Sequence, residues 1–449
     1  MSVPDARAAA RPTAETSNTM NAPWNLLRRH NPPLRVAALV DLARNKQSGG
    51  HVKWWERLGA AAAKPAEDEA PLDLTVYFSG HGPDEVLSPN VRFRHLPPVF
   101  STARLKFLPY MPDHADLSPY HPRLARELPG YDLIHATDGF FAFARTAERI
   151  ARGRAIALTT SFHTDTPAYT RIFTRSTIDR IFARWPQAKR KLIEEWNAPE
   201  RQRQKMDRRL AIHLRQCAGA FVTRAEDRDL AAGILGEGRV GNLRLGVDKA
   251  MFGPHRRDSA RVRRDYAIPD GRTLALFVGR VDVGKNVPIL IEAAARAIRA
   301  GAPLHLMIAG VGPLAEEASR RLGDRVTLTG FVAPDELARL YASADFFALP
   351  SEVEIGSMAT IEAIASGCPA LIAHNSGSPV LLDRTQAIRA VHSGVDAWTA
   401  ALIDMAGDAG RLAAMRAAGV DYGARHLASW RDVLREDLLS GWRAALKTV

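Results

Sequence analysis

Cysteines, aromatic residues and long apolar runs are all scarce in this chain of 449 residues. Its two cysteines, Cys217 and Cys368, lie in segments that we assign to different domains, so a disulfide scaffold is excluded and neither residue fits a zinc cluster. No run approaches the ~20 apolar residues of a membrane-spanning helix, and the first residues lack the order of a signal peptide. These absences predict a soluble protein of a reducing, cytoplasmic compartment.

The composition is that of an ordinary globular protein. With 46% hydrophobic, 24% charged and 7% aromatic residues, it excludes a collagen-like, coiled-coil or wholly disordered chain. A single core rarely grows beyond ~250 to 300 residues, so two domains are expected. Residues 1–30 are rich in Ala, Arg, Thr, Ser and Pro without apolar periodicity, which predicts a disordered tail.

Short β-rich runs alternate with helical stretches along the rest of the chain. This alternation is typical of parallel sheets flanked by helices, an α/β architecture. The first series of predicted strands is Leu34 to Leu42, Leu72 to Ser79, Val91 to Leu96, Tyr131 to Ala136, Ala155 to His163 and Gly219 to Thr223. The second series is Leu274 to Val281, Leu304 to Ala309, Arg325 to Leu328, Asp345 to Leu349 and Pro369 to Ala373.

Turn-forming residues and charges gather between the two series, at 249–262, where we place a linker. We therefore predict an N-terminal domain over 31–248, a C-terminal domain over 263–425 and a last helix over 426–449. Ligands of open α/β sheets bind beyond the carboxyl ends of the strands, so two facing sheets would form a cleft between the domains.

Two glutamates, Glu354 and Glu362, follow the predicted strand that ends at Leu349. A carboxylate can accept hydrogen bonds from the vicinal diol of a ribose or hexose. Between them, a helix start at Ser357, Met358 and Ala359 would offer free N–H groups to a phosphate. Together these features suit a nucleotide sugar, whereas the competing interpretation is a glutamate pair on a solvated helix face.

Two cations follow another predicted strand, in Phe277-Val-Gly-Arg-Val-Asp-Val-Gly-Lys-Asn286. Arg280 and Lys285 at a strand's carboxyl end would form a clamp for a diphosphate, although two surface cations are the simpler interpretation. In the N-terminal half, Gly49 and Gly50 follow the first strand and begin a helix, where the backbone can closely approach a sugar or phosphate. His163 stands at the end of another strand.

The order of these motifs resembles family 4 of the retaining GT-B glycosyltransferases, strongly over 274–380 and more weakly from residue 34. The resemblance implies two Rossmann-like α/β domains facing a cleft. It also implies that Arg280 and Lys285 hold the donor diphosphate, that Glu354 and His163 lie at the transferred sugar, and that Glu362 binds the ribose. Val332 would line the base pocket.

Three positions depart from the family pattern. Ser357 stands where the family commonly has glycine, and Gly284 stands where an acidic residue often precedes the phosphate-binding lysine. The segment Ser376-Gly-Ser-Pro-Val380 replaces the family's Gly-Gly-x-Pro-Glu. These departures leave the identity of the sugar open.

Two further motifs suggest other chemistries. Asp227-Arg-Asp229 matches a metal-binding pattern, but its place at a predicted helix start favours a capping role, so we expect no metal. Gly310-Val-Gly312 approaches a dinucleotide fingerprint, which would indicate a nicotinamide-dependent oxidoreductase, but the expected acidic residue is missing.

Positive charge is concentrated between Arg171 and Arg215, where 13 Lys+Arg minus 5 Asp+Glu leaves +8 of the chain's net +12. Interleaved apolar residues, Trp185 and Trp196 among them, indicate a helix lying on an anionic membrane surface. A helical hairpin packed on its own domain is the alternative. Nucleic acid is not expected as a partner, because no recognised binding motif accompanies the charge.

The resulting hypothesis is a retaining, metal-independent glycosyltransferase without a cofactor. It would transfer a sugar from a nucleotide-sugar donor, predicted to be UDP-linked, to a membrane lipid such as diacylglycerol or ceramide, at the inner face of the cytoplasmic membrane. A lipopolysaccharide or exopolysaccharide acceptor is one alternative. A nicotinamide-dependent oxidoreductase and a non-catalytic lipid-binding module are alternatives of other classes.

Overall fold

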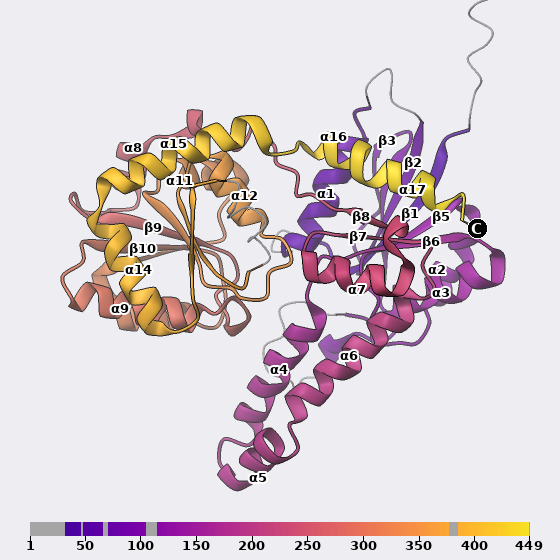
Figure 1. Cartoon of the computed structure of the whole chain (residues 1–449), viewed down its shortest axis with the longest axis horizontal. Helices are drawn as coiled ribbons and strands as arrows, with labels where there is room; N and C mark the ends of the chain where they lie inside the picture. Colours follow the sequence, from indigo (N-terminus) through magenta and orange to yellow (C-terminus); the bar gives the residue numbers. More distant parts are fainter. Residues whose placement is uncertain (1–31, 46–47, 66–70, 105–114, 377–384, 449) are drawn as a thin grey trace, which may run out of the picture.

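Two α/β domains lie side by side and are joined by two crossings of the chain (Figure 1). The computed structural model describes residues 32–45, 48–65, 71–104, 115–376 and 385–448. The tail predicted for 1–30 lies outside these ranges. So do residues 377–380, which belong to the segment that departs from the family's Gly-Gly-x-Pro-Glu pattern. Each domain has its own sheet and core, so the predicted class of two Rossmann-like α/β domains is confirmed.

The N-terminal sheet has eight strands in the order β3-β4-β2-β1-β5-β6-β7-β8. All neighbours pair in parallel except β3, which is antiparallel to β4. In register, Val36 of β1 lies between Leu74 of β2 and Leu133 of β5. The strands are β1 (Leu34–Ala43), β2 (Leu72–Ser79), β3 (Glu85–Ser88), β4 (Val91–Leu96), β5 (Leu133–Ala136), β6 (Ala157–Ser161), β7 (Gly219–Val222) and β8 (Val240–Asn242).

Alternate residues of β1 enter the cores on opposite faces of this sheet. Val36 and Val40 join Trp54 in one core, whereas Ala37 and Leu39 join the core on the other face. This alternation is the two-residue period of a strand with both faces covered. The covering helices are α1 (Gly50–Ala62), α2 (Pro122–Glu127), α3 (Ala142–Arg154), α6 (Ala198–Leu214) and α7 (Ala225–Leu235).

The C-terminal sheet is wholly parallel, in the order β11-β10-β9-β12-β13-β14. Its strands are β9 (Thr273–Val278), β10 (Leu304–Ala309), β11 (Val326–Gly330), β12 (Phe346–Leu349), β13 (Ala370–Ala373) and β14 (Ile388–Val391). The flanking helices are α8 (Ser259–Asp265), α9 (Val287–Arg299), α10 (Ala315–Leu322), α11 (Pro334–Ser343), α12 (Met358–Ala365), α14 (Val395–Gly407) and α15 (Ala409–His426). A short 3₁₀ turn, η7 (Val283–Lys285), precedes α9.

The structure corrects the predicted linker. Leu243 belongs to the N-terminal core, whereas Val247, Phe252 and Val262 are buried in the C-terminal core. The chain therefore crosses between the domains over 243–247, before the predicted 249–262. Residues 249–262 have turn formers and charges because they cover the second core, which sequence composition does not distinguish from a linker.

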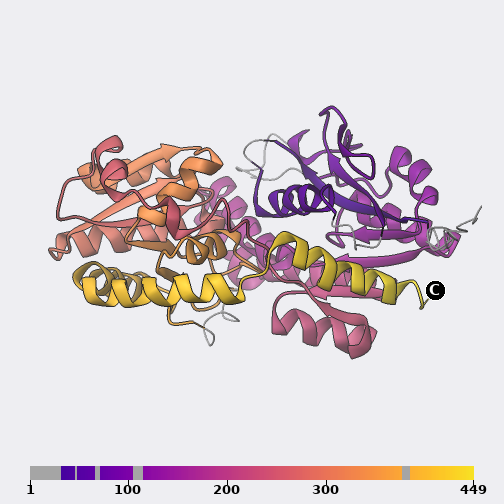
Figure 2. The ribbon, with the colours of Figure 1, turned by 90° about the horizontal axis from the view of Figure 1, so that it is seen from above.

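The chain returns to the N-terminal domain beside the first crossing. Gly246 and Ala428 form a parallel bridge, and a Cβ on Gly246 would meet Trp430 at 2.6 Å. The returning segment, the yellow end of the chain in Figure 2, is α16 (Trp430–Asp432), the π-helix η9 (Val433–Leu439) and α17 (Ser440–Ala445). It buries Trp442 against the N-terminal core. Glycine at 246 is required because the two crossings touch.

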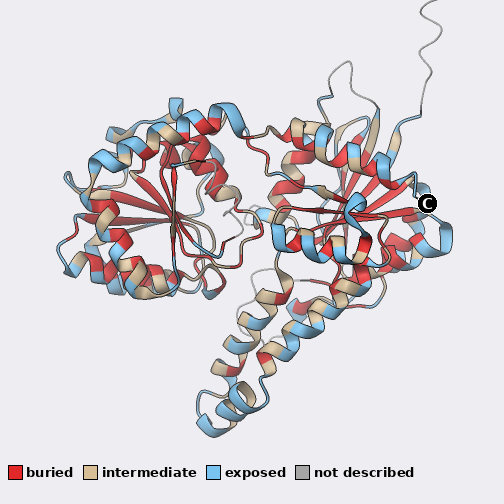
Figure 3. Ribbon diagram, viewed as in Figure 1, coloured by how far each residue is buried: buried red, intermediate tan, exposed pale blue. Residues whose placement is uncertain are grey.

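A helical arm projects from the N-terminal domain. It is formed by α4 (Thr166–Ile181), α5 (Pro186–Arg190), the π-helix η4 (Lys191–Glu195) and α6, and its outer end is mostly exposed (Figure 3). Trp185 and Trp196 at that end are 61% and 51% exposed. The basic segment is therefore a hairpin, but its outer half packs on itself and not on the sheet. Every helix in the described ranges is too short or too polar to cross a bilayer.

Candidate active site

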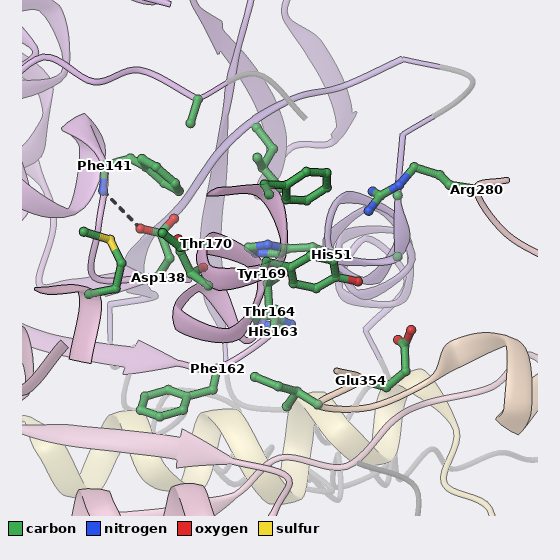
Figure 4. Close-up of a pocket in the computed structure, with 18 of the residues that line it drawn as sticks. His51, Asp138, Phe141, Phe162, His163, Thr164, Tyr169, Thr170, Arg280 and Glu354 are labelled. Carbon is green, nitrogen blue, oxygen red and sulfur yellow. Dashed lines mark hydrogen bonds between the residues drawn. The ribbon is translucent and has the colours of Figure 1, made fainter. Parts of the chain in front are cut away.

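A cavity of about 620 Å³ lies between the two domains, at the carboxyl ends of their strands. Both domains supply predicted residues to its wall. They are Gly49, Gly50 and His163 from the N-terminal domain and Arg280, Lys285, Glu354 and Met358 from the C-terminal domain. Figure 4 shows Arg280 and Glu354 at one end of the cavity, the histidines near its middle and Phe141 at the other end.

The loop after β9 holds the two cations in place. The buried carboxylate of Asp282 accepts hydrogen bonds from the Arg280 side chain at 3.2 Å and from the Lys285 backbone N–H at 3.0 Å. Asp282 thereby caps the turn η7 and orients Arg280 with the same side chain. A Cβ on Gly49 would lie 3.4 Å from Arg280, so the start of α1 approaches this guanidinium across the domain boundary.

Lys285 and Glu354 form an ion pair inside the cavity wall. The Lys285 Nζ donates to Glu354 Oε1 at 2.5 Å, and the side chains are 19% and 11% exposed. Burial favours the protonated acid, but the charge of Lys285 outweighs it and lowers the pKa of Glu354. Burial likewise disfavours the charged amine, yet Glu354 raises the pKa of Lys285 above its ordinary value. Both groups are therefore charged at neutral pH.

The presence of glycine at position 284, in place of an acidic residue, has a steric explanation. A Cβ at this position would meet the ring of Tyr169 at 2.9 Å, because α4 packs against η7 across the cleft. The acidic side chain that the family pattern led us to expect there would displace Tyr169. The departure at Gly284 therefore makes room for an aromatic residue of the cavity wall.

The loop after β12 leads into α12. Ser357 is the N-cap of α12, and its hydroxyl accepts from the Thr360 N–H at 3.1 Å. Only Met358 of the predicted Ser357 to Ala359 helix start is part of the cavity wall, since Ala359 packs against the C-terminal core. Ser357 therefore stabilises the helix start itself and does not face the cavity.

Glu362 and Val332 do not belong to this cavity wall. The carboxylate of Glu362 is 7% exposed and forms an ion pair with Arg57 of α1, a contact between the domains. Val332 packs against the C-terminal core. The ribose and base positions that the resemblance implies thus lie beyond the cavity that holds Glu354.

His163 follows β6 and lies among aromatic and histidine rings. Its Nε2 is 3.3 Å from the donating Trp55 Nε1 and 2.8 Å from Ser161 Oγ, and its ring stacks on His51 with centroids 4.5 Å apart. Burial, His51 and His135 hold the pKa of His163 well below its usual value. His163 is therefore neutral, unlike the charged pair on the opposite wall.

Several wall residues were missed by sequence reasoning. They are aromatic and aliphatic side chains of α4, α6 and nearby loops: Phe141, Phe162, Tyr169, Phe173, Ile178 and Met206. Tyr169 and Phe173 stack with centroids 6.0 Å apart. Their four-residue spacing places them on one helix face, which was the available signal, but the sequence does not say which face meets the cleft.

The two competing motifs have structural explanations. A Cβ at Gly310 would lie 1.8 Å from the Gly279 carbonyl oxygen, and one at Gly312 would lie 2.4 Å from that of Val281. These glycines allow the loops after β9 and β10 to touch. Asp227 accepts two hydrogen bonds from Arg224 in the first turn of α7, at 2.7 and 2.8 Å.

Comparison with known proteins supports the resemblance. Residues 272–408 match the family model described as Glycosyl transferases group 1. The chain is 32% identical over 212 residues to the D-inositol 3-phosphate glycosyltransferase of Segniliparus rotundus, covering 45% of this chain and 46% of that protein. It is 35% identical over 125 residues to the alpha-monoglucosyldiacylglycerol synthase of Streptococcus pneumoniae, covering 27% and 28%. These alignments span less than half of each relative.

The fold likeness extends over nearly the whole chain. The crystal structure of Anabaena HepE in complex with UDP and glucose superposes with a TM-score of 0.59 at 14% identity, covering 92% of this chain and 99% of that one. This establishes the GT-B fold. The predicted resemblance to group 1 glycosyltransferases is confirmed.

Proposed function

We propose that this protein is a retaining glycosyltransferase that moves a sugar from a nucleotide-sugar donor to a membrane lipid. The observation that carries the proposal is the cavity in which the cations of one domain face the neutral His163 of the other. A glycosyl transfer needs both kinds of group, because a diphosphate anion leaves the anomeric carbon while a neutral acceptor hydroxyl attacks the same carbon.

The C-terminal wall suits the leaving diphosphate. Arg280 and Lys285 would stabilise the negative charge that develops as the glycosidic bond breaks, without a metal or a cofactor. Lys285 is paired with Glu354 in the free protein, so donor binding would share its charge between the carboxylate and the phosphate. Glu354 and His163 would then contact the transferred sugar, and a donor phosphate oxygen would accept the acceptor's proton.

The N-terminal wall suits a lipid acceptor. One face of α4 lines the cavity with Tyr169, Phe173 and Ile178, and the same helix leads out to the exposed end of the arm. That end exposes Trp185 and Trp196 among basic side chains, as expected for a surface that touches anionic lipid. The named activity of the streptococcal relative concerns a diacylglycerol lipid. We propose a diacylglycerol-type or ceramide-type acceptor and a UDP-linked donor, at the inner face of the cytoplasmic membrane.

A donor and acceptor panel tests this function. Purified protein should transfer label from one UDP-sugar to a lipid in a membrane extract, with the donor's anomeric configuration retained in the product by NMR and with activity unchanged by EDTA. Transfer to polysaccharide instead of lipid would contradict the acceptor proposal. Nicotinamide oxidation or reduction without any sugar transfer, or lipid binding without transfer, would contradict the enzyme class.

A further inference from the structure

A chain of hydrogen bonds leads from the last helix of the protein to His163. Trp442 Nε1 of α17 donates to His135 Nδ1 at 3.1 Å, His135 Nε2 is 2.8 Å from Ser161 Oγ, and Ser161 Oγ is 2.8 Å from His163 Nε2. Trp442, His135 and Ser161 are all fully buried. The chain therefore runs through the N-terminal core and ends at the cavity.

The direction of every bond in this chain follows from Trp442. An indole N–H can only donate, so His135 Nδ1 must accept and, in a neutral ring, its proton must be on Nε2. His135 Nε2 then donates to Ser161 Oγ, which leaves the serine hydroxyl to donate to His163 Nε2. Thr159 Oγ1, 2.9 Å from His135 Nδ1, donates to the same acceptor. His163 Nε2 is thus an acceptor.

A second indole imposes the same result independently. Trp55 Nε1 donates directly to His163 Nε2. Two indole donors on α1 and α17, far apart in the sequence, therefore require the proton of the neutral His163 to be on Nδ1. No described group hydrogen-bonds to this Nδ1, and the ring lines the cavity.

We propose that Trp442 is a positioning residue for His163. Acting through His135 and Ser161, and together with Trp55, it fixes His163 as the Nδ1–H tautomer. His163 then presents a neutral hydrogen-bond donor to the transferring sugar. The role toward the sugar rests on the proposed function. His163 is then unable to act as a base through Nε2, because that atom already accepts from two donors. The helix that returns to the N-terminal domain would serve the site as well as the packing.

The structure offers control indoles outside this chain of hydrogen bonds. Trp430 lies on the same returning segment as Trp442, Trp398 lies in α14 of the C-terminal domain, and both are buried with an Nε1 that has no hydrogen-bond partner among the described residues. Trp55→Phe and Trp442→Phe remove a donor of the network. Trp398→Phe and Trp430→Phe remove a comparable aromatic N–H outside it.

The tautomer is measured by NMR of histidine ring nitrogens in the full-length protein, with His163→Gln used for assignment. The wild-type His163 should show a protonated Nδ1 and an unprotonated Nε2, and the Trp398→Phe Trp430→Phe variant should match it. The Trp55→Phe Trp442→Phe variant should give a mixture of tautomers, and its turnover should fall roughly ten- to a hundredfold, as when supporting hydrogen-bond partners of metal-ligating histidines are lost. The Michaelis constant for the donor should change little.

Ser161→Ala provides a test with little change in packing. If the bonds form one chain, Trp442→Phe alters the His163 nitrogen shifts in the wild type but not in the Ser161→Ala background. A protonated Nε2 in the wild type, equal changes in the control variant, or an undiminished effect of Trp442→Phe without Ser161 would each overturn the proposal. The NMR result needs no substrate, so absence of sugar transfer by the wild type would contradict the proposed function and leave the tautomer assignment standing.

Discussion

The two walls of the cavity hold their polar groups by opposite means. The C-terminal wall keeps its groups charged, because Lys285 and Glu354 are paired and Asp282 holds Arg280. The N-terminal wall keeps its histidines His51 and His163 neutral, because they are buried beside His135 and no described carboxylate pairs with them. A charged wall can stabilise a leaving anion, whereas a neutral wall can donate hydrogen bonds beside an apolar acceptor path without attracting that anion.

The largest effect is expected from a substitution that removes a charge from the C-terminal wall. Lys285→Gln should cost about 2 to 4 kcal/mol of transition-state stabilisation, that is about thirty- to a thousandfold in turnover, because a developing diphosphate loses a preorganised cation. Lys53→Gln is the control, since Lys53 also pairs with a glutamate, Glu56 at 2.7 Å, but does not line the cavity. Steady-state kinetics with the donor measure both. A loss of turnover under tenfold for Lys285→Gln would contradict the proposed role of Lys285 in holding the diphosphate.

The next effect concerns the outer end of the N-terminal arm. Arg184, Arg190 and Lys191 form no ion pair with any described residue, and each Lys or Arg near an anionic surface contributes about 1 kcal/mol. Changing all three to Glu should weaken sedimentation with anionic liposomes roughly a hundredfold, and salt should weaken wild-type binding as well. The control changes three exposed arginines of the C-terminal domain, Arg264, Arg299 and Arg320, to Glu. Equal losses in both triple variants would mean that net charge and not the arm governs binding.

Glu362 offers a sharper test of where the charged wall ends. Glu362→Gln and Arg57→Gln both break the ion pair between the domains, so both should lower the melting temperature by a similar amount. Only Glu362→Gln removes the carboxylate predicted to bind the ribose, so it alone should raise the donor Michaelis constant, by about tenfold or ~1.4 kcal/mol. An unchanged Michaelis constant for the donor in Glu362→Gln would mean that this carboxylate serves the contact between the domains and does not bind the ribose.

The strands show how much of the fold the sequence could predict. All eleven predicted strands were found, and most of them are runs of buried apolar residues in a sheet covered on both faces, although β11 has no buried residue. The missed strands β3, β8 and β14 each lie at a sheet edge and have four residues or fewer, so tertiary pairing decides their conformation.

The site was predictable where local sequence fixes geometry. Arg280, Lys285 and Glu354 follow strands directly, so their placement at the cavity needed only the rule that strand ends meet at one edge. Glu362 could not be placed, because its partner Arg57 lies 305 positions away in the other domain. Trp442 could not be connected to His163 for the same reason, since the link exists only once α17 returns to the first sheet.

The smallest effect tests whether the N-terminal wall is neutral. Burial lowers the pKa of His51 from 6.5 to about 3, so the folded state binds this proton less well than the unfolded state. The favourable contribution of the neutral ring is full above pH 6.5 and is lost as the pH falls below it, by at most about 1.4 kcal/mol per pH unit. Because His51 lines the cavity, solvent should make the effect smaller. His51→Gln should therefore flatten the acid side of the stability curve measured by urea unfolding, whereas His255→Gln, an exposed control, should not. If His51→Gln leaves the acid slope unchanged, the ring is protonated or exposed in the folded protein, and the contrast between a charged and a neutral wall does not hold.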